Sequence, residues 1–222
     1  MKNIAIITAM DSEYNAVYSL YNFTGDENKS TTVVYDKKIS LIKSGIGKVN
    51  ATIAALNAIQ NGADIVITTG LAGGIDASLS QGDIVLADKI AYHDVNCGEP
   101  NSIGQVQGLP LYYDLSSNVI KNNVKDVESG YFKLGLILTG DQFVTDKDHL
   151  LKIKSDFPQG VAVDMESAAI AQVCHIYQKE CISLRIISDV VGKVNQEEQY
   201  RNFWASIPTK SAEMIDVILR NI

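Results

Sequence analysis

The chain has 222 residues, of which 46% are hydrophobic, and this length and composition predict one globular domain with a sizeable core. Its formal net charge of −7 disfavours nucleic acid and anionic membrane surfaces as partners. No stretch approaches the ~20 apolar residues of a membrane span. The apolar start of the chain also lacks the basic region and cleavage site of a signal peptide. We therefore expect a cytoplasmic protein.

Short apolar runs rich in Val and Ile alternate with longer amphipathic stretches along the chain. Asp11 is expected to cap the first helix, and Val49, Ile53 and Leu56 follow the helical period of the second. In chain order, strands are expected at residues 4–10, 38–43, 65–69, 84–87, 134–139, 161–163 and 182–187. Helices are expected at residues 14–20, 49–59, 166–177 and 203–220.

This alternation predicts an α/β fold. We expect a single domain over residues 1–222, with a central mixed, largely parallel sheet flanked by helices. Residues 93–114 are polar, rich in Gly and Pro and without a period, so they are expected to form a long loop. Loops of this length in compact domains are commonly functional or mobile.

Two glycine-rich segments, residues 44–48 and 69–74, each follow an expected strand. Neither has the spacing of a phosphate-binding loop or of a dinucleotide fingerprint. One interpretation is a pair of tight strand-to-helix turns. The other is that the backbone approaches a ligand closely there, which glycine permits. In open α/β sheets, ligands bind outside the carboxyl ends of the strands, where both segments fall.

Carboxylates follow three of the expected strands. Glu13 comes after the first strand, Asp164 and Glu166 after the strand at 161–163, and Asp189 after the strand at 182–187. Any one of them could be a helix cap or a solvated charge, but their shared placement indicates a general acid/base site. The scattered cysteines and histidines predict neither a disulfide nor a metal site. We therefore expect chemistry without a metal or cofactor.

The chain resembles the bacterial 5′-methylthioadenosine/S-adenosylhomocysteine nucleosidases, which have a nucleoside phosphorylase/hydrolase-like fold. The resemblance extends from residue 4 to near the C-terminus, and the order of its motifs makes it specific. The matching segments are IITAMDSE (6–13), KSGIGKV (43–49), TGLAGG (69–74), GDIV (82–85), YHD (92–94), GDQF (140–143), VDMESAAIA (163–171) and RIISD (185–189).

The resemblance implies catalytic roles for three acids. Glu13 matches the acid that activates the attacking water, and Glu166 the acid that holds the ribose hydroxyls. Asp189 matches the acid that supports protonation of the purine at N7. These roles are chemically consistent, because adenine is a poor leaving group until it is protonated. Carboxylates also stabilise the oxocarbenium-like ribosyl group that develops. Burial is expected to raise the pKa of Asp189.

The resemblance also implies a set of substrate-binding residues. Phe143 matches the ring that stacks on adenine, and the Val144 backbone the group that reads the adenine edge. Ser188 is expected to steady Asp189, and Arg185 to lie near the water. The remaining members of the set are Met10 and Ile46 in the pocket for the 5′-substituent, Leu71, Ala72 and Gly73 in the second glycine-rich segment, and Asp164 and Met165 beside Glu166.

Two features depart from the family pattern. Leu71 stands where the bacterial nucleosidases usually have a serine, close to the ribose and the water. The loop at residues 95–110 lacks the aromatic residues that cover the 5′-alkylthio group in the partner subunit. Both departures fall on the ribose and 5′ side, so the sequence predicts adenine release more firmly than it predicts the 5′-substituent.

Three functions remain open at this level: a hydrolase, a phosphorylase that uses phosphate, and a catalytically weakened nucleoside-binding homologue. The related phosphorylases hold phosphate with several arginines, whereas this chain has only Arg185, Arg201 and Arg220, so water is the expected nucleophile. The complete set of acids argues against binding alone. The resemblance further implies a small adenine nucleoside as ligand and a homodimer in which the loop after His93 reaches the neighbouring site.

Overall fold

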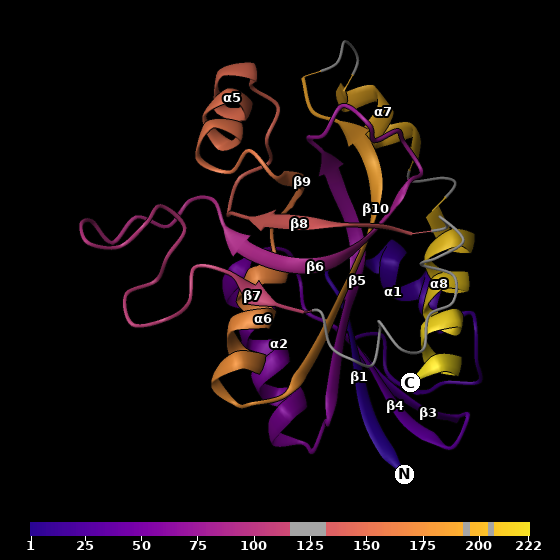
Figure 1. Ribbon diagram of the computed structural model, residues 1–222. Coiled ribbons are helices and arrows are strands. Elements are labelled where there is room, and N and C mark those ends of the chain that lie inside the picture. The colour runs from indigo at the N-terminus through magenta and orange to yellow at the C-terminus, as the bar shows by residue number, and fades with distance from the viewer. Residues whose placement is uncertain (116–131, 193–195, 204–206) are drawn as a thin grey trace.

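The computed structural model describes residues 1–115, 132–192, 196–203 and 207–222. A single mixed sheet forms its centre (Figure 1). Its strands are β1 (Lys2–Thr8), β2 (Thr24–Gly25), β3 (Lys29–Val34), β4 (Lys37–Lys43), β5 (Ile65–Gly74), β6 (Ile84–Tyr92), β7 (Tyr113–Asp114), β8 (Lys133–Thr139), β9 (Gly160–Asp164) and β10 (Glu180–Val190). The helices are α1 (Asp11–Tyr18), α2 (Lys48–Gln60), α5 (Lys147–Asp156), α6 (Ser167–Ile176), α7 (Gln196–Phe203) and α8 (Ile207–Asn221).

Strand β5 lies at the centre of the sheet and pairs in parallel with β1 on one side and β10 on the other. It also pairs antiparallel with β9, so that β5, β9, β8, β6 and β10 form a closed ring. Parallel and antiparallel pairs are equally frequent among the described strands, and the expected predominance of parallel pairs is therefore not observed. The antiparallel pairs come from ring closure and from the short strands β2, β3 and β7, which carry little apolar signal.

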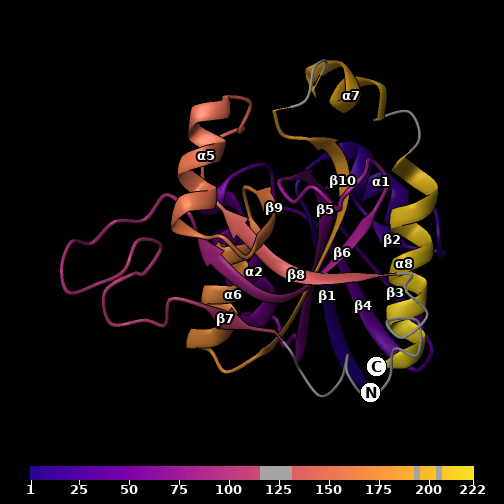
Figure 2. The same ribbon diagram turned by 45° about the horizontal axis from the view of Figure 1, so that its top comes forward.

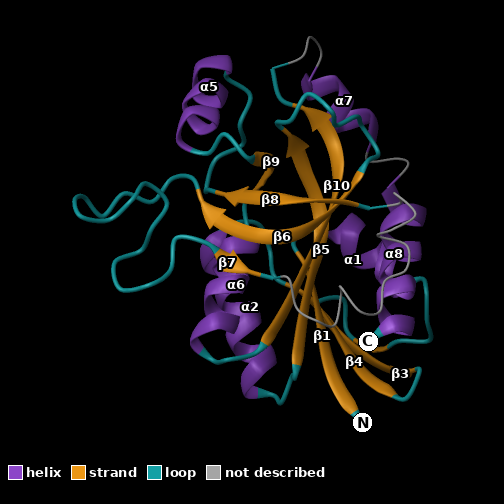
Figure 3. Ribbon diagram, viewed as in Figure 1, coloured by secondary structure: helices purple, strands orange, loops and turns teal. Residues whose placement is uncertain are grey.

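Helices cover the sheet on two sides, as Figure 3 shows. Helices α2 and α6 pack against each other and share one core cluster with the sheet, whereas α1 and α8 pack together in a second cluster. In the second cluster, Tyr14 and Val17 of α1 contact the buried face of α8 that includes Ile215 and Leu219. This packing fixes α1, whose first turn carries Glu13. None of the described helices is long and apolar enough to cross a membrane.

The strands and helices expected from the apolar runs are present, with shifted ends. The first expected cap is wrong, because α1 begins at Asp11 itself and Met10 is its N-cap residue. The Asp11 carboxylate instead pairs with Lys43 at 2.5 Å, and the Glu13 carboxylate accepts the N–H groups of Ala9 and of the N-cap residue Met10. The expected helix at 203–220 corresponds to α8, which begins at Ile207. Residue 203 is instead the last residue of α7, and residues 204–206 lie outside the described part of the chain. Helices α5 and α7 were not predicted.

The two glycine-rich segments differ in structure. Residues 44–48 connect β4 to α2, as the turn interpretation predicts. Residues 69–74 are not a turn, because β5 continues without interruption to Gly74. The expected loop after β6 is present and projects from the body of the molecule, with its last two residues in β7 (Figure 2).

Candidate active site

A pocket opens near the carboxyl ends of β1, β5, β9 and β10. Strands β5 and β10 end in the upper part of the molecule in Figure 1. The pocket wall combines four carboxyl groups with apolar side chains and a few neutral polar ones. The lining residues are Ala9, Met10, Glu13, Ile46, Leu71, Ala72, Gly73, Gln142, Phe143, Val144, Val163, Asp164, Met165, Glu166, Ser188, Asp189 and Tyr200. Every site residue expected from the sequence is in this set except Arg185, which lines a smaller adjoining pocket with Glu13 and Glu166.

Glu13 is held by three backbone N–H groups. Its Oε2 accepts from Ala9 at 2.9 Å and Met10 at 3.0 Å, and its Oε1 accepts from Leu71 at 3.0 Å. The side chain is only 3% exposed, and burial raises its pKa against the opposing effect of Arg185 and the backbone donors. The residue at position 71 therefore fixes Glu13 through its main chain, independently of the side chain that departs from the family pattern.

Gly70 allows this arrangement. A Cβ at position 70 would lie 2.5 Å from Glu13 Oε1, so only glycine lets the carboxylate rest against β5. The glycine-rich end of β5 is thus a close-approach segment rather than a turn. It brings Glu13 of α1 against the same strand that lines the pocket.

Glu166 and Asp164 share a buried ionic network with Arg185. Arg185 Nε lies 2.7 Å from Asp164 Oδ2, and its Nη2 donates to Thr68 Oγ1 at 3.0 Å. Glu166 Oε1 accepts the Gly47 N–H at 2.9 Å. Burial and the nearby Asp164 charge raise the pKa of Glu166 to about 7, although Arg185 and the Gly47 N–H oppose this. Arg185 is itself only 2% exposed and is not part of the lining of the main pocket, so it can influence a ligand there only through the acids beside it.

Asp189 lies next to a bulge in β10. The register against β5 shifts between Ile187 and Asp189, so Ser188 and Asp189 both line the pocket although neighbours in a regular strand face opposite sides. Ser188 donates its hydroxyl to Asp189 Oδ1, and Gln196 donates to Oδ2 at 2.7 Å. Burial raises the pKa of Asp189, and these two hydrogen bonds oppose that rise.

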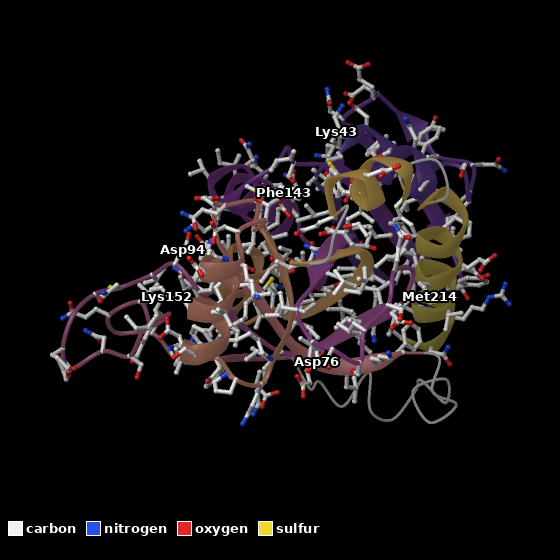
Figure 4. The ribbon with its side chains drawn as sticks, turned by 90° about the horizontal axis from the view of Figure 1, so that it is seen from above. Lys43, Asp76, Asp94, Phe143, Lys152 and Met214 are labelled. Carbon is white, nitrogen blue, oxygen red and sulfur yellow. The ribbon has the colours of Figure 1, made fainter. Side chains whose placement is uncertain are left out.

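Aromatic rings form the outer wall of the pocket. Phe143 is 51% exposed and lies 5.0 Å from the Tyr200 ring of α7, between ring centroids, at an interplanar angle of 58°. Figure 4 looks down on this end of the molecule and labels Phe143. A half-exposed aromatic face beside buried carboxyl groups suits a flat heterocycle that carries polar edges.

Sequence reasoning missed the lining residues Ala9, Gln142, Val163 and Tyr200, and it missed Gln196, which binds Asp189 from behind the pocket. Gln196 and Tyr200 belong to α7, which carries little apolar signal of its own. Gln196 and Tyr200 are four residues apart and therefore lie on one face of the helix. This spacing was the one feature of the sequence that could have indicated their shared location. No group of three or more His, Cys, Asp or Glu side chains that could hold a metal ion occurs among the described residues.

The fold and the pocket together define a nucleoside-processing enzyme of the α/β class. The family model of the phosphorylase superfamily matches residues 3–221. The chain is 34% identical to a 5′-methylthioadenosine/S-adenosylhomocysteine nucleosidase of Lysinibacillus sphaericus, over 99% of this chain and 98% of the relative.

Solved structures of nucleosidases are also similar to this chain over its whole length. The nucleosidase structure of Borrelia burgdorferi bound to adenine superposes with a TM-score of 0.91 at 30% identity, covering 99% of this chain and 100% of that one. The S-adenosylhomocysteine nucleosidase of Streptococcus pyogenes, in complex with 5-methylthiotubericidin, has a TM-score of 0.91 at 31% identity and covers 100% of this chain and 97% of that one. The protein belongs to the 5′-methylthioadenosine/S-adenosylhomocysteine nucleosidase family of the phosphorylase superfamily.

Gly70→Ala is expected to displace the Glu13 carboxylate, because the new Cβ would collide with Oε1 while three N–H groups restrain it. We expect adenine release from 5′-methylthioadenosine to fall about 100-fold, as for other small misplacements of reacting groups. The matched control is Gly62→Ala, which introduces strain at a φ of +90° but makes only an ordinary contact far from the pocket. Equal activities of the two variants in a steady-state assay would contradict the role of Gly70.

Proposed function

We propose that this protein hydrolyses the N-glycosidic bond of 5′-methylthioadenosine, S-adenosylhomocysteine or a related 5′-modified adenine nucleoside. The observation that carries the proposal is the convergence of Glu13, Glu166 and Asp189 on one pocket beside Phe143. These residues belong to a chain whose whole length matches nucleosidases of that name. Water attacks C1′, the bond from C1′ to N9 of the purine breaks, and the purine leaves with a proton on N7.

Asp189 supports protonation of the leaving group. Its raised pKa keeps a larger share of the carboxyl group protonated near neutral pH than an exposed aspartate would have. Phe143 stacks on the purine, and the Val144 main chain reads the purine edge. Both residues line the pocket with Asp189, which supports this division of roles.

Glu13 activates the water, and Glu166 holds the ribose hydroxyls. The bonds from Ala9, Met10 and Leu71 leave Glu13 with a fixed orientation toward the pocket, which suits a base that must meet a water in one geometry. The ribose hydroxyls donate to Glu166 in its ionised form, and its carboxylate stabilises the positive charge that develops on the sugar.

The charges of the pocket favour water over phosphate as the nucleophile. Its lining includes the four carboxyl groups of Glu13, Asp164, Glu166 and Asp189, and no Lys or Arg side chain among the described residues. The nearby Arg185 is committed to Asp164 in a buried ion pair. A phosphate dianion would therefore meet like charge without a guanidinium fork to hold it.

The direct test is to incubate the protein with 5′-methylthioadenosine, with and without phosphate, and to follow adenine and the sugar product. We expect equal adenine release in both, with a free 5-methylthioribose product. Asp189→Asn should slow release by about 10²–10⁴-fold, the usual contribution of a positioned acid. The control Asp148→Asn, at an exposed position of α5, should not. Release that requires phosphate, or a sugar phosphate product, would show a phosphorylase instead.

We also propose that the protein forms a homodimer through the outer face of α2. Val49 and Ile53 lie one turn apart on this helix and are 71% and 54% exposed, and Ile46 just before it is 51% exposed. Adjacent exposed apolar side chains of this size are typical of interfaces. The loop between β6 and β7 projects from the body of the molecule (Figure 1), which supports its proposed contribution to a neighbouring site.

Sedimentation velocity tests this assembly. The wild-type protein is expected to sediment as a species of twice the chain mass, and Val49→Asp with Ile53→Asp should give a monomer, because both charges would be buried on association. The control Val33→Asp changes an equally exposed valine on β3, away from α2, and should leave the dimer intact. A monomeric wild-type protein would refute the homodimer.

A further inference from the structure

Gln196, the first residue of α7, is a buried amide with every hydrogen-bonding group in use. Its Nε2 donates to the Val144 carbonyl oxygen at 2.9 Å and to Asp189 Oδ2 at 2.7 Å. Its Oε1 accepts the Gly192 N–H at 3.0 Å. The side chain is 6% exposed. An amide has two N–H donors, so both are spent on these acceptors, and a flipped amide would lose all three bonds.

This amide joins three segments of the chain. Val144 follows β8, Asp189 belongs to the end of β10, and Gln196 begins α7. Val144 and Asp189 line the pocket, whereas Gln196 is not part of its lining and lies behind them. The amide therefore acts on a ligand only through the two acceptors that it connects.

We propose that Gln196 is a positioning residue for purine specificity, which ties the Val144 carbonyl to Asp189 so that both face the 6-amino group of the purine as acceptors. The inference rests on the proposed function and deepens it. Because one nitrogen reaches both oxygens within 2.9 Å, the two acceptors are close neighbours at one end of the pocket.

The pair of acceptors distinguishes an amino from an oxo purine. A 6-amino group carries two N–H donors and satisfies both oxygens. A 6-oxo group would place a third acceptor against them and leave buried groups unpaired, which is the kind of mismatch that gives strong discrimination. The Gln196 amide holds the two oxygens in this acceptor arrangement before the ligand arrives.

The Gln196 amide also affects the pKa of Asp189. Asp189 receives N–H and O–H donors from Gln196 and Ser188, and no described ion pair involves it. The donor from Gln196 stabilises the ionised carboxylate and opposes the rise in pKa that burial causes. Loss of the amide should therefore raise the pKa of Asp189 further and extend activity to higher pH.

The test compares wild type, Gln196→Leu and the control Gln172→Leu. Gln172, on α6, accepts the Tyr92 hydroxyl at 2.8 Å and does not line the pocket, so the control removes one glutamine hydrogen bond elsewhere. For Gln196→Leu we expect kcat/KM for the adenine nucleoside to fall about 100-fold. The preference for adenine over hypoxanthine nucleosides should fall at least about tenfold. The alkaline limb of the pH profile should move upward.

A carboxyl titration by ¹³C NMR keeps the inference testable without activity. Asp189 should titrate at higher pH in Gln196→Leu than in wild type, and at higher pH again in the isosteric Gln196→Glu, which places a second carboxylate beside it. The glutamate variant also serves if the leucine variant does not fold. Unchanged purine preference together with an unchanged Asp189 titration would overturn the role of Gln196. If wild type released no adenine, the proposed function would fail, and the titration alone would decide the link to Asp189.

Discussion

The structure depends on keeping several carboxyl groups buried in one pocket. Isolated buried carboxylates are strongly disfavoured, so each must be paired, hydrogen-bonded or protonated. Asp164 is paired with Arg185, Glu13 is bound by three backbone N–H groups, and Glu166 accepts one from Gly47. Asp189 is bound by two neutral side chains, Ser188 and Gln196, and its pKa, unlike those of Glu13 and Glu166, is not lowered by Arg185. Burial with this partial compensation raises the pKa values of Glu13, Glu166 and Asp189, which is the kind of tuning that the proposed acid and base roles require.

The backbone supplies this compensation at places where regular structure is interrupted. Gly47 adopts a φ of +95° before α2 and turns its N–H toward Glu166, a conformation that other residues rarely adopt. Gly70 leaves room for Glu13 against β5. The bulge in β10 turns Ser188 and Asp189 to the same side. Main-chain geometry therefore sets the positions of Glu13, Glu166 and Asp189. Leu71 is compatible with this arrangement because its main-chain N–H, and not its side chain, binds Glu13.

Local patterns in the sequence were sufficient for the main strands and helices and for the strand-end acids. The ordered motifs then gave each acid an expected role, and the structure brings these residues to one pocket. Residues 69–74 were harder to interpret, because glycines punctuate turns far more often than they extend a central strand. The share of antiparallel pairs could not be predicted either, because no local sequence pattern in β9 indicates the direction in which it pairs with β5.

Gln196 and Tyr200 show a different limit. Their importance lies in contacts with segments distant in the chain, Val144 and Phe143, and no local pattern specifies such partners. From the sequence alone, a polar residue in a hydrophilic helix is expected to be exposed to solvent, and only the fold shows that Gln196 is buried. The residues proposed to bind the purine could thus be found from the sequence, whereas the Gln196 amide that connects two of them could not.

The central claim is that burial with incomplete compensation raises the pKa values of Glu13, Glu166 and Asp189 above those of exposed acids. A ¹³C NMR titration of the carboxyl groups, assigned with Glu13→Gln, Glu166→Gln and Asp189→Asn, measures this directly. The account predicts that all three groups titrate above their usual range and that Glu166 does so near pH 7. Titration of the three groups at the ordinary values of about 4 would contradict it.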